Sequence, residues 1–129
     1  MEDRYLFKAK RTDNEEWVTG SLITCGDGTC KIATRYLDDS ANIAILICAY
    51  DVDRDTICQS TGLKDKNGKL IWENDIVKIS GHIYVCYWDE YNFEWGLKSK
   101  TETVGLGYID KCIIEVIGNI FDNPELLEV

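Results

Sequence analysis

The chain has 129 residues, and its 14 Lys and Arg against 23 Asp and Glu give a formal net charge of −9. This length fits one domain or two very small ones. An apolar content of 45% with one Pro excludes a disordered or collagen-like chain. The acidic balance disfavours broad binding to nucleic acid through a basic face, because the averaged field repels phosphate. No constellation of residues specifies a reaction, so we expect a protein that is not an enzyme and needs no cofactor.

The six cysteines would suggest three disulfides in a secreted chain of this size. However, residues 1–4 carry no apolar stretch of the kind that marks export. The longest apolar run, residues 43–50, is far shorter than the roughly 20 residues that a membrane span needs. We therefore expect a cytoplasmic protein with reduced thiols and no membrane association. Three cysteines lie within apolar stretches and are expected to be small core residues: Cys48, Cys86 and Cys112.

In the first half of the chain, the residue pattern predicts strands over residues 31–36 and 43–50. The Gly-Asp-Gly segment at residues 26–28 supplies residues that accept positive φ, and it predicts a turn. The polar stretch at residues 51–61 is the best candidate for a boundary. We therefore expect two parts, an N-terminal β region over residues 1–60 and a second domain over residues 61–129.

In the second half, the Asn-Gly pair at residues 67–68 predicts a hairpin turn. Apolar and polar residues alternate over residues 82–88 and 92–98, and a polar turn at residues 89–92 separates the two runs. The two runs therefore predict a further hairpin. Two other segments are predicted as strands, residues 76–79 and 112–120.

Short strands at close spacing, each with one apolar face, must close or form a sandwich to bury that face. After Gly62 the order is turn, strand, hairpin, long return and final strand, which predicts a small SH3-like barrel. Pro124 suits the first position of a short helix over residues 124–127, which Asp122 or Asn123 can cap. We therefore expect a mainly β chain with an SH3-like barrel in its C-terminal half, additional N-terminal strands and a short C-terminal helix.

Residues 59–69, 71–77 and 115–127, in this order and spacing, resemble the YopX family of phage and prophage proteins. Residues 7–22 also resemble the opening of that family. Family members usually carry Gly where this chain has Asn74, and Asn is the next most tolerant of a left-handed turn, so we expect the backbone bend to persist. The resemblance implies an SH3-type barrel and a phage origin. It implies no activity for particular residues.

Three lysines form a local basic cluster on this acidic chain: Lys64, Lys66 and Lys69. They are candidate binding residues of a ligand loop. The other interpretation is a tight hairpin that fixes strand register, with the lysines keeping the edge soluble. We favour the hairpin, because Asn-Gly is among the strongest short hairpin signals.

Aromatic residues are concentrated on the predicted hairpin of residues 82–98. SH3-like barrels present such residues to a peptide or to unstacked bases. Alternating aromatic residues also fill the core of a small barrel. We expect Phe93 and Trp95 in the core, and we expect Trp88 and Tyr91, next to the turn, to be exposed as candidate binding residues.

Candidate metal ligands are few. Cys25 and Cys30 could supply half of a zinc site, but no second Cys or His pair lies nearby and the chain has one His. The acidic residues 51–55 open like a calcium loop, yet the sixth position lacks Gly and the twelfth lacks Glu, so we expect a solvated acidic loop. His82 lies in a predicted strand beside no obvious nucleophile. We assign no metal site, and whether Cys25 and Cys30 hold a metal stays open.

These observations favour a non-enzymatic accessory protein that acts as an interaction module for a host or phage protein in the host cytoplasm. The alternative is a single-stranded nucleic-acid-binding protein in phage DNA metabolism, which would use the lysine cluster and the hairpin aromatics against an unfavourable net charge. An enzyme would need a deep pocket with shifted titratable groups. Strand edges predict a homo-oligomer, because symmetric pairing covers them.

Overall fold

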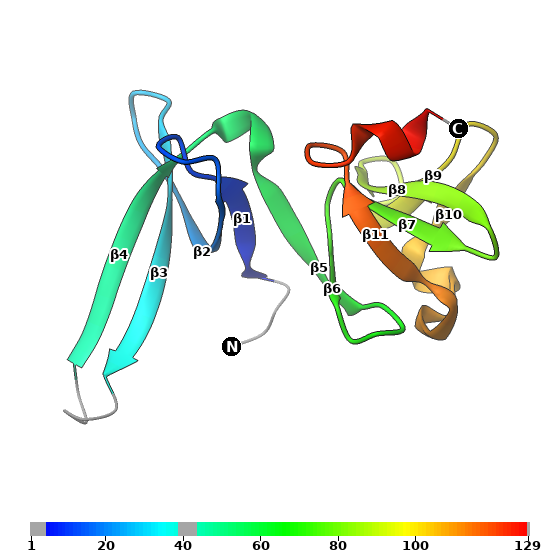
Figure 1. The fold of residues 1–129 in the computed structure, drawn as a ribbon, viewed down its shortest axis with the longest axis horizontal. Helices are drawn as coiled ribbons and strands as arrows, with labels where there is room; N and C mark the ends of the chain where they lie inside the picture. Colours follow the sequence, from blue (N-terminus) through cyan, green and yellow to red (C-terminus); the bar gives the residue numbers. More distant parts are fainter. Residues whose placement is uncertain (1–4, 39–43, 129) are drawn as a thin grey trace. The chain divides into compact units, whose positions relative to one another are not determined.

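The structure is a computed structural model that describes residues 5–38 and 44–128 of the chain. It divides into two compact units, Met1–Gln59 and Ser60–Val129. Both are built from antiparallel strands, and the helices in the described residues are short 3-10 turns (Figure 1). The chain is therefore mainly β, as the residue pattern predicts. No helix in the described ranges is long and apolar enough to cross a membrane.

In the first unit the strands lie in the order β4-β3-β2-β1, and β1 also pairs with the start of β5 (Cys58–Lys64). β3 and β4 pair along their whole length. Both strands predicted from the sequence in this unit are confirmed, although Ile43 lies outside the described residues. The elements are β1 (Phe7–Lys10), β2 (Trp17–Thr24), β3 (Cys30–Asp38), β4 (Ala44–Val52) and the 3-10 helix η2 (Arg54–Thr56).

The core of the first unit is small. Gly20 on β2 allows a close approach to β3, since an added Cβ would lie 2.1 Å from the carbonyl oxygen of Ala33. A side chain at this position therefore requires a shift of the backbone. The buried residues of this core are Ala9, Cys30, Ile32 and Val52, and partly buried Phe7, Val18, Leu22 and Ile57 pack against them.

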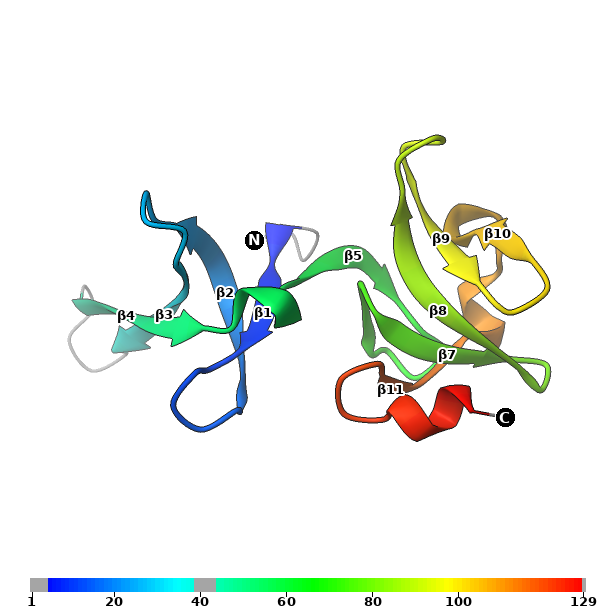
Figure 2. The same cartoon turned by 90° about the horizontal axis from the view of Figure 1, so that it is seen from above.

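The second unit holds a five-stranded antiparallel sheet in the order β10-β9-β8-β7-β11. The curvature of β8 is visible in Figure 2. A hairpin of β5 (Cys58–Lys64) and β6 (Leu70–Trp72) precedes this sheet. The strands of the sheet are β7 (Asp75–Ile79), β8 (His82–Asp89), β9 (Glu94–Lys98), β10 (Thr103–Gly105) and β11 (Glu115–Asn119).

The sheet of the second unit is open, and this corrects the closed barrel expected from the sequence. β10 and β11 are its two edges in the described residues, with no ladder between them. After β10 the chain forms two 3-10 helices, η3 (Leu106–Tyr108) and η4 (Lys111–Ile113), before β11 begins. Closure fails because this segment turns helically where a barrel needs continuing strand. For the same reason the predicted strand over residues 112–120 begins only at Glu115.

One face of the open sheet supplies the core of the second unit. Tyr84 and Cys86 on β8 and Leu97 on β9 are buried, because alternate residues of a strand point to the same face. Leu106 of η3 is fully buried beside them. The remaining buried members are aliphatic: Ile71, Val77, Ile79, Ile114 and Val116.

The cysteines differ in their burial. Cys86 is a small core residue, as predicted, and Cys48 is half-buried. Cys112 is exposed, so its predicted burial is wrong. The reason is that Cys112 lies in η4, where the alternation of a strand does not apply. Among the described residues no disulfide joins the cysteines.

The last regular element is the 3-10 turn η5 (Pro124–Leu127), which corrects the expected C-terminal helix. Pro124 begins it, and the N–H of Leu126 donates to the carbonyl of Asn123 at 3.1 Å. Asn123 does not cap it with its side chain, because Oδ1 accepts from the N–H of Asn119 at 3.3 Å. The four residues form the i to i+3 bonds of a 3-10 turn and no longer helix.

Candidate binding surfaces

The turn that carries the predicted lysine cluster is organised by a buried acid, Asp65. Its Oδ1 accepts hydrogen bonds from the N–H groups of Asn67 and Lys69, both at 2.9 Å. Its Oδ2 accepts from the N–H of Val116 on β11, also at 2.9 Å. Gly68 has a φ of +79°, so the Asn-Gly turn forms as predicted.

The protonation state of Asp65 follows from these contacts. Burial raises the pKa of its carboxyl, but the hydrogen bonds from Val116, Lys69 and Asn67 outweigh burial and leave the pKa below its ordinary value. The carboxylate is therefore charged at neutral pH and fixes both the turn and its attachment to β11. A second attachment is the bond from the N–H of Lys66 to the carbonyl of Ile114 at 2.9 Å.

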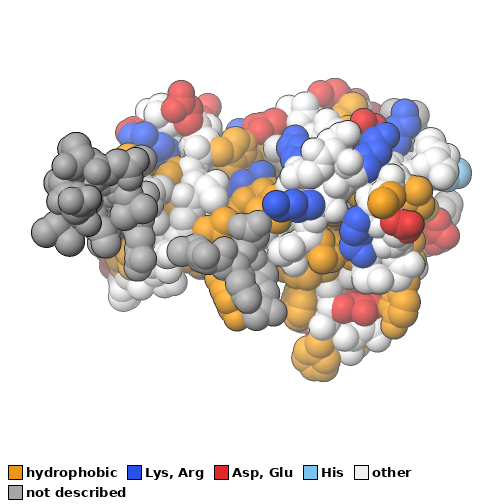
Figure 3. Space-filling view, turned by 90° about the horizontal axis from the view of Figure 1, so that it is seen from below, with side chains coloured by type: hydrophobic (Ala, Val, Ile, Leu, Met, Phe, Trp, Pro, Cys, Tyr) orange, Lys and Arg blue, Asp and Glu red, His pale blue; other side chains and the backbone are white. Residues whose placement is uncertain are grey.

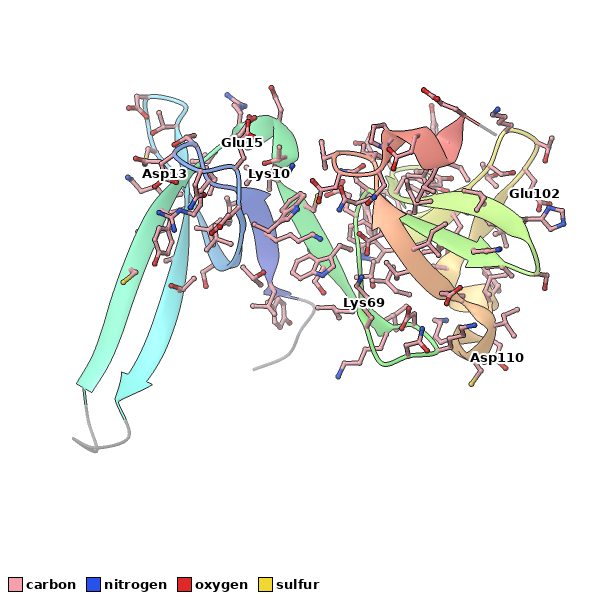
Figure 4. All side chains as sticks on the ribbon, viewed as in Figure 1. Lys10, Asp13, Glu15, Lys69, Glu102 and Asp110 are labelled. Carbon is pink, nitrogen blue, oxygen red and sulfur yellow. The ribbon has the colours of Figure 1, made fainter. Side chains whose placement is uncertain are left out.

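The three lysine side chains are exposed around this turn. Lys66 Nζ lies 3.9 Å from a carboxylate oxygen of Glu115, and Figure 4 labels Lys69 beside the β5–β6 hairpin. The backbone contacts of Asp65 account for the turn without any ligand. The structure thus favours the hairpin interpretation of this motif, and a ligand role for Lys64, Lys66 and Lys69 stays a prediction.

Two further parts of the family-like segments have a local structural role. Thr61 Oγ1 donates to the carbonyl of Ile71 at 2.7 Å, which joins β5 to the strand that follows the turn. Asn74 has a φ of +70°, so the predicted left-handed bend is confirmed at a position with a side chain. Asp75 is buried, and its carboxylate accepts from the N–H of Trp72 at 2.9 Å. This hydrogen bond closes the turn that leads into β7.

The second candidate surface is the end of the β8–β9 hairpin. Asp89 organises the turn, because its carboxylate accepts from the N–H of Tyr91 at 3.0 Å and from the side-chain amide of Asn92 at 2.8 Å. The bond from the Asn92 side chain is the main cause that lowers the pKa of Asp89. A fixed backbone therefore presents the residues at this end.

Three aromatic side chains at this end face solvent, and we call them the aromatic hairpin end: Trp88, Tyr91 and Phe93. Their exposed fractions are 42%, 96% and 78%. Trp88 and Tyr91 were predicted to be exposed. Phe93 was predicted to lie in the core, and this prediction is wrong. Phe93 has a φ of +52° and lies in the turn before β9, so the alternation of the strand does not extend to it.

Trp88 is held by a partner on the neighbouring strand. It lies opposite Trp95 in the β8–β9 ladder, and the two rings meet edge to face with centroids 5.2 Å apart. Trp95 is partly buried and packs against the core of the second unit. An aromatic pair of this geometry contributes about 0.5–1.5 kcal/mol beyond its buried area, so the Trp88 ring has a preferred position.

Charges around the aromatic hairpin end are acidic. Asp89 and Glu90 lie in the turn, and Glu94 begins β9 opposite Asp89. Lys98 is four residues farther along β9, with its Nζ 4.9 Å from the ring centroid of Tyr87. Elsewhere charges are mixed, since the face drawn in Figure 3 shows Lys and Arg interspersed with Asp and Glu. The aromatic hairpin end therefore disfavours phosphate and suits a basic partner.

The two predicted candidate surfaces do not form one site. The lysine turn is bonded to β11, an edge of the sheet, whereas Trp88 and Tyr91 belong to the end of the β8–β9 hairpin. Figure 2 shows the tip of this hairpin pointing away from the turn between β5 and β6. The nucleic-acid alternative therefore requires one ligand that reaches both of these elements.

The predicted metal candidates lie in or beside two turns of the first unit. Cys30 is buried in the core, and Cys25 closes the β2–β3 turn through a bond from its N–H to the carbonyl of Thr29 at 2.8 Å. Asp53 caps η2 by accepting from the N–H of Asp55 at 3.0 Å. In residues 5–38 and 44–128 no three Cys, His, Asp or Glu side chains gather where they could hold a metal ion.

Sequence reasoning missed Phe93 as a surface residue. The signal was present, because four polar turn positions precede it and place it at the same turn as Tyr91. Tyr108 was also missed. It is 81% exposed in η3, and its ring lies over Gly105, where an added Cβ would come within 2.7 Å of it.

Comparisons with known proteins give a family and solved structures to which the chain is similar. A family model described as YopX protein matches residues 6–128. The chain is similar to the crystal structure of protein yopX from Bacillus subtilis, with 21% identity, a TM-score of 0.58 and coverage of 96% of this chain and 98% of that one. It is also similar to protein EF1440 from Enterococcus faecalis, with 28% identity, a TM-score of 0.47 and coverage of 94% and 96%. No curated protein matches the chain.

Proposed function

This chain belongs to the YopX family, and from this premise we propose that it is a non-enzymatic interaction module that binds a protein partner through the aromatic hairpin end. The observation that carries the proposal is the exposure of Trp88, Tyr91 and Phe93 on a turn whose backbone Asp89 fixes. Large aromatic side chains are frequent anchors of protein interfaces. A preformed turn lowers the entropy that binding costs.

The position of Phe93 supports this role. A bulky residue with positive φ costs folding free energy, and here the exposed ring regains little of it by burial. Strained positions of this kind are common where a chain binds another molecule. Tyr91, which is almost fully exposed, adds a second ring at the same turn. In a complex, burial of these rings removes from water the apolar area that folding leaves exposed.

The charge of the surroundings indicates the class of partner. Asp89, Glu90 and Glu94 give this end of the hairpin a negative charge. A partner with an apolar pocket and a basic rim complements them, and such complementarity speeds association. A nucleic-acid ligand is disfavoured, because these acidic side chains repel its phosphates.

The SH3-like description of the second unit is part of this proposal. It is supported by the family resemblance and by the curved antiparallel sheet preceded by the β5–β6 hairpin. SH3-like domains bind peptides on surfaces lined by aromatic residues. An experimental structure that keeps this strand order and curvature would support it, and a different strand order would contradict it.

The cellular setting is proposed from the family resemblance. It is an accessory role in the cytoplasm of a host cell, for a protein of phage or prophage origin. The partner is then a host or phage protein that the cell contains during infection.

We also propose that the chain forms a homo-oligomer through β4. This strand is an edge in the described part of the chain, and residues 44–50 contain no Lys, Glu or Pro, which usually protect an edge from pairing. Light scattering after size exclusion should give a mass above the 14.7 kDa of one chain. Ala49→Lys, which places a charge on β4, should shift the mass towards the monomer. A monomeric parent protein would refute the oligomer.

The main test compares partners captured from infected host cells by the parent protein and by variants. Tyr91→Ala with Phe93→Ala should lose the main partner, because both anchors are removed. Tyr108→Ala is the matched control, since it removes an equally exposed aromatic ring outside the hairpin. Equal capture by all three proteins would contradict the proposal. Salt-sensitive binding of a single-stranded oligonucleotide, lost when Lys64, Lys66 and Lys69 are replaced, would support the nucleic-acid alternative instead.

A further inference from the structure

A pocket of about 590 Å³ lies within the second unit. Its walls are the start of β8, the loop between β9 and β10, and η5. This volume is in the range of pockets that bind small molecules. None of the three residues of the aromatic hairpin end lines it. The pocket is thus a second place where this unit can bind a ligand.

One part of the pocket wall is apolar. Ile83 and Val85 are alternate residues of β8 and point to the same side of the strand. Leu126 and Leu127 of η5 complete this part of the wall. All four side chains are only partly buried, so each still exposes apolar surface. Burial of this surface by an apolar ligand is favourable.

The loop on another side of the pocket is held in place by its own contacts. Ser99 accepts from the N–H of Glu102 at 3.2 Å through its hydroxyl, and its own N–H donates to the carbonyl of Glu102 at 2.9 Å. Figure 4 labels Glu102 on this loop, next to the β7–β8 hairpin. A loop closed by these bonds is ordered before a ligand arrives.

The acid of this loop is already engaged. The hydroxyl of Tyr84 donates a hydrogen bond to Oε1 of Glu102. This bond is the main cause that raises the pKa of Tyr84, so its hydroxyl keeps its proton at neutral pH. One oxygen of the only acidic side chain in the described pocket wall is therefore satisfied within the protein.

The two lysines in the wall outnumber this acid. Lys98 and Lys100 both line the pocket and both are exposed at its rim. Lys98 Nζ lies 4.9 Å from the ring centroid of Tyr87, which restricts where its ammonium can lie. Among the described residues that line the pocket, two charged side chains are cationic and one is acidic, with His82 counted as neutral, on a protein with a net charge of −9. A local reversal of charge next to an apolar wall suits an anion with an apolar body.

We propose that this pocket binds a carboxylate attached to an apolar body, with the body against Ile83, Val85, Leu126 and Leu127 and the carboxylate at Lys98 and Lys100. A carboxylate accepts charge-assisted hydrogen bonds from ammonium groups. A free aliphatic acid and the carboxyl end of a polypeptide share this chemistry. The proposal does not depend on the aromatic hairpin end, because none of its residues takes part.

The test is a titration of the full chain followed by amide chemical shifts, with octanoate as the probe. Shifts should saturate and concentrate at His82, Ile83, Ser99 and Leu126. Octan-1-ol has the same apolar body without the charge, and it should bind about tenfold more weakly, as expected for one lost charge-assisted contact. Octanoate and octanol that bind alike would overturn the proposal.

Paired variants identify the residues. Lys98→Gln with Lys100→Gln should weaken octanoate binding about tenfold. Lys64→Gln with Lys69→Gln is the matched control, because it removes the same charge from the lysine turn. Equal weakening in both pairs, or shifts spread evenly over the chain, would overturn the proposal, since only the net charge would then matter.

A tripeptide distinguishes the two sources of the carboxylate. N-acetyl-Gly-Leu-Leu with a free carboxyl end should compete with octanoate if a polypeptide end is the ligand, and its amidated form should not. If only octanoate binds, the ligand is a free small acid. If neither octanoate nor the free tripeptide shifts the pocket amides, the proposal is refuted.

Discussion

Asp65→Asn is the most direct test of the reasoning about the second unit. Asparagine keeps one carbonyl oxygen, which can still accept from the N–H groups of Asn67 and Lys69. Its amide nitrogen cannot accept from the N–H of Val116, so one buried donor loses its partner. An unsatisfied buried donor costs about 1–3 kcal/mol, and the remaining two bonds weaken because they lose their charge. The gain from no longer burying a charge offsets part of this loss. We expect a net decrease of about 2–3 kcal/mol in the free energy of unfolding.

Urea unfolding followed by tryptophan fluorescence measures this decrease. Trp72, Trp88 and Trp95, three of the four tryptophans, lie in the second unit and report on it. Asp89→Asn is the matched control, since Asp89 accepts similar hydrogen bonds in a turn that solvent reaches. Its loss should be smaller. Equal losses in the two variants would refute the argument that the burial of Asp65 makes its contacts costly to remove.

The difference in stability between the parent chain and Asp65→Asn should depend on pH, and the sign of this dependence follows from the pKa of Asp65. The pKa of Asp65 is lower in the folded chain than its ordinary value of about 3.9. Its contribution to stability is therefore present above that value and is lost as the pH falls through the folded-state pKa. The difference between the parent chain and Asp65→Asn should be largest at pH 7 and should shrink at pH 3. A difference that grows on acidification would contradict the lowered pKa.

Three further predictions concern single backbone positions. Gly20→Ala should destabilise the first unit by about 2–4 kcal/mol, because the added Cβ would lie 2.1 Å from the carbonyl oxygen of Ala33. Thermal unfolding measures this loss of stability. Gly26→Ala has nothing within 4 Å of its added Cβ and should change stability little in that measurement. Phe93→Asn should stabilise the chain by about 0.5–1 kcal/mol, because Asn tolerates positive φ and the lost ring was exposed; a clear loss of stability would show that the ring packs on the protein. Asn74→Gly should leave stability unchanged or raise it, whereas Asn74→Ala should lower it by about 1 kcal/mol, because position 74 has a positive φ. Denaturant midpoints check this order, and the reverse order would contradict a required left-handed bend.

Local features of the fold could be predicted from the sequence. Alternation predicted the β8–β9 hairpin, and the Asn-Gly pair predicted the turn that includes Gly68, because both signals act within a few residues. Asn74 adopts the expected left-handed conformation for the same reason. Barrel closure depends on pairing between β10 and β11, the two edges of the sheet, and the alternation within each strand does not determine whether two edges pair.

Errors at single residues have a common cause. Cys112 and Phe93 both lie in segments that the sequence predicted as strand, and both lie just before a strand begins. Element boundaries are the least predictable feature of a sequence, since fraying and turn geometry decide them. At the candidate surfaces, the exposure of Trp88 and Tyr91 could be predicted from the neighbouring turn. The pocket beside Glu102 could not, because three separate segments form it.

The hydrogen bond between Asp65 and Val116 also has a consequence for biosynthesis. The two residues are 51 positions apart, so the turn emerges from the ribosome well before its partner strand. Until β11 is made, the carboxylate of Asp65 stays hydrated and the early hairpin lacks its final anchor. The second unit therefore completes folding only after β11 has left the ribosome, and a nascent chain cut short before Val116 lacks this anchor.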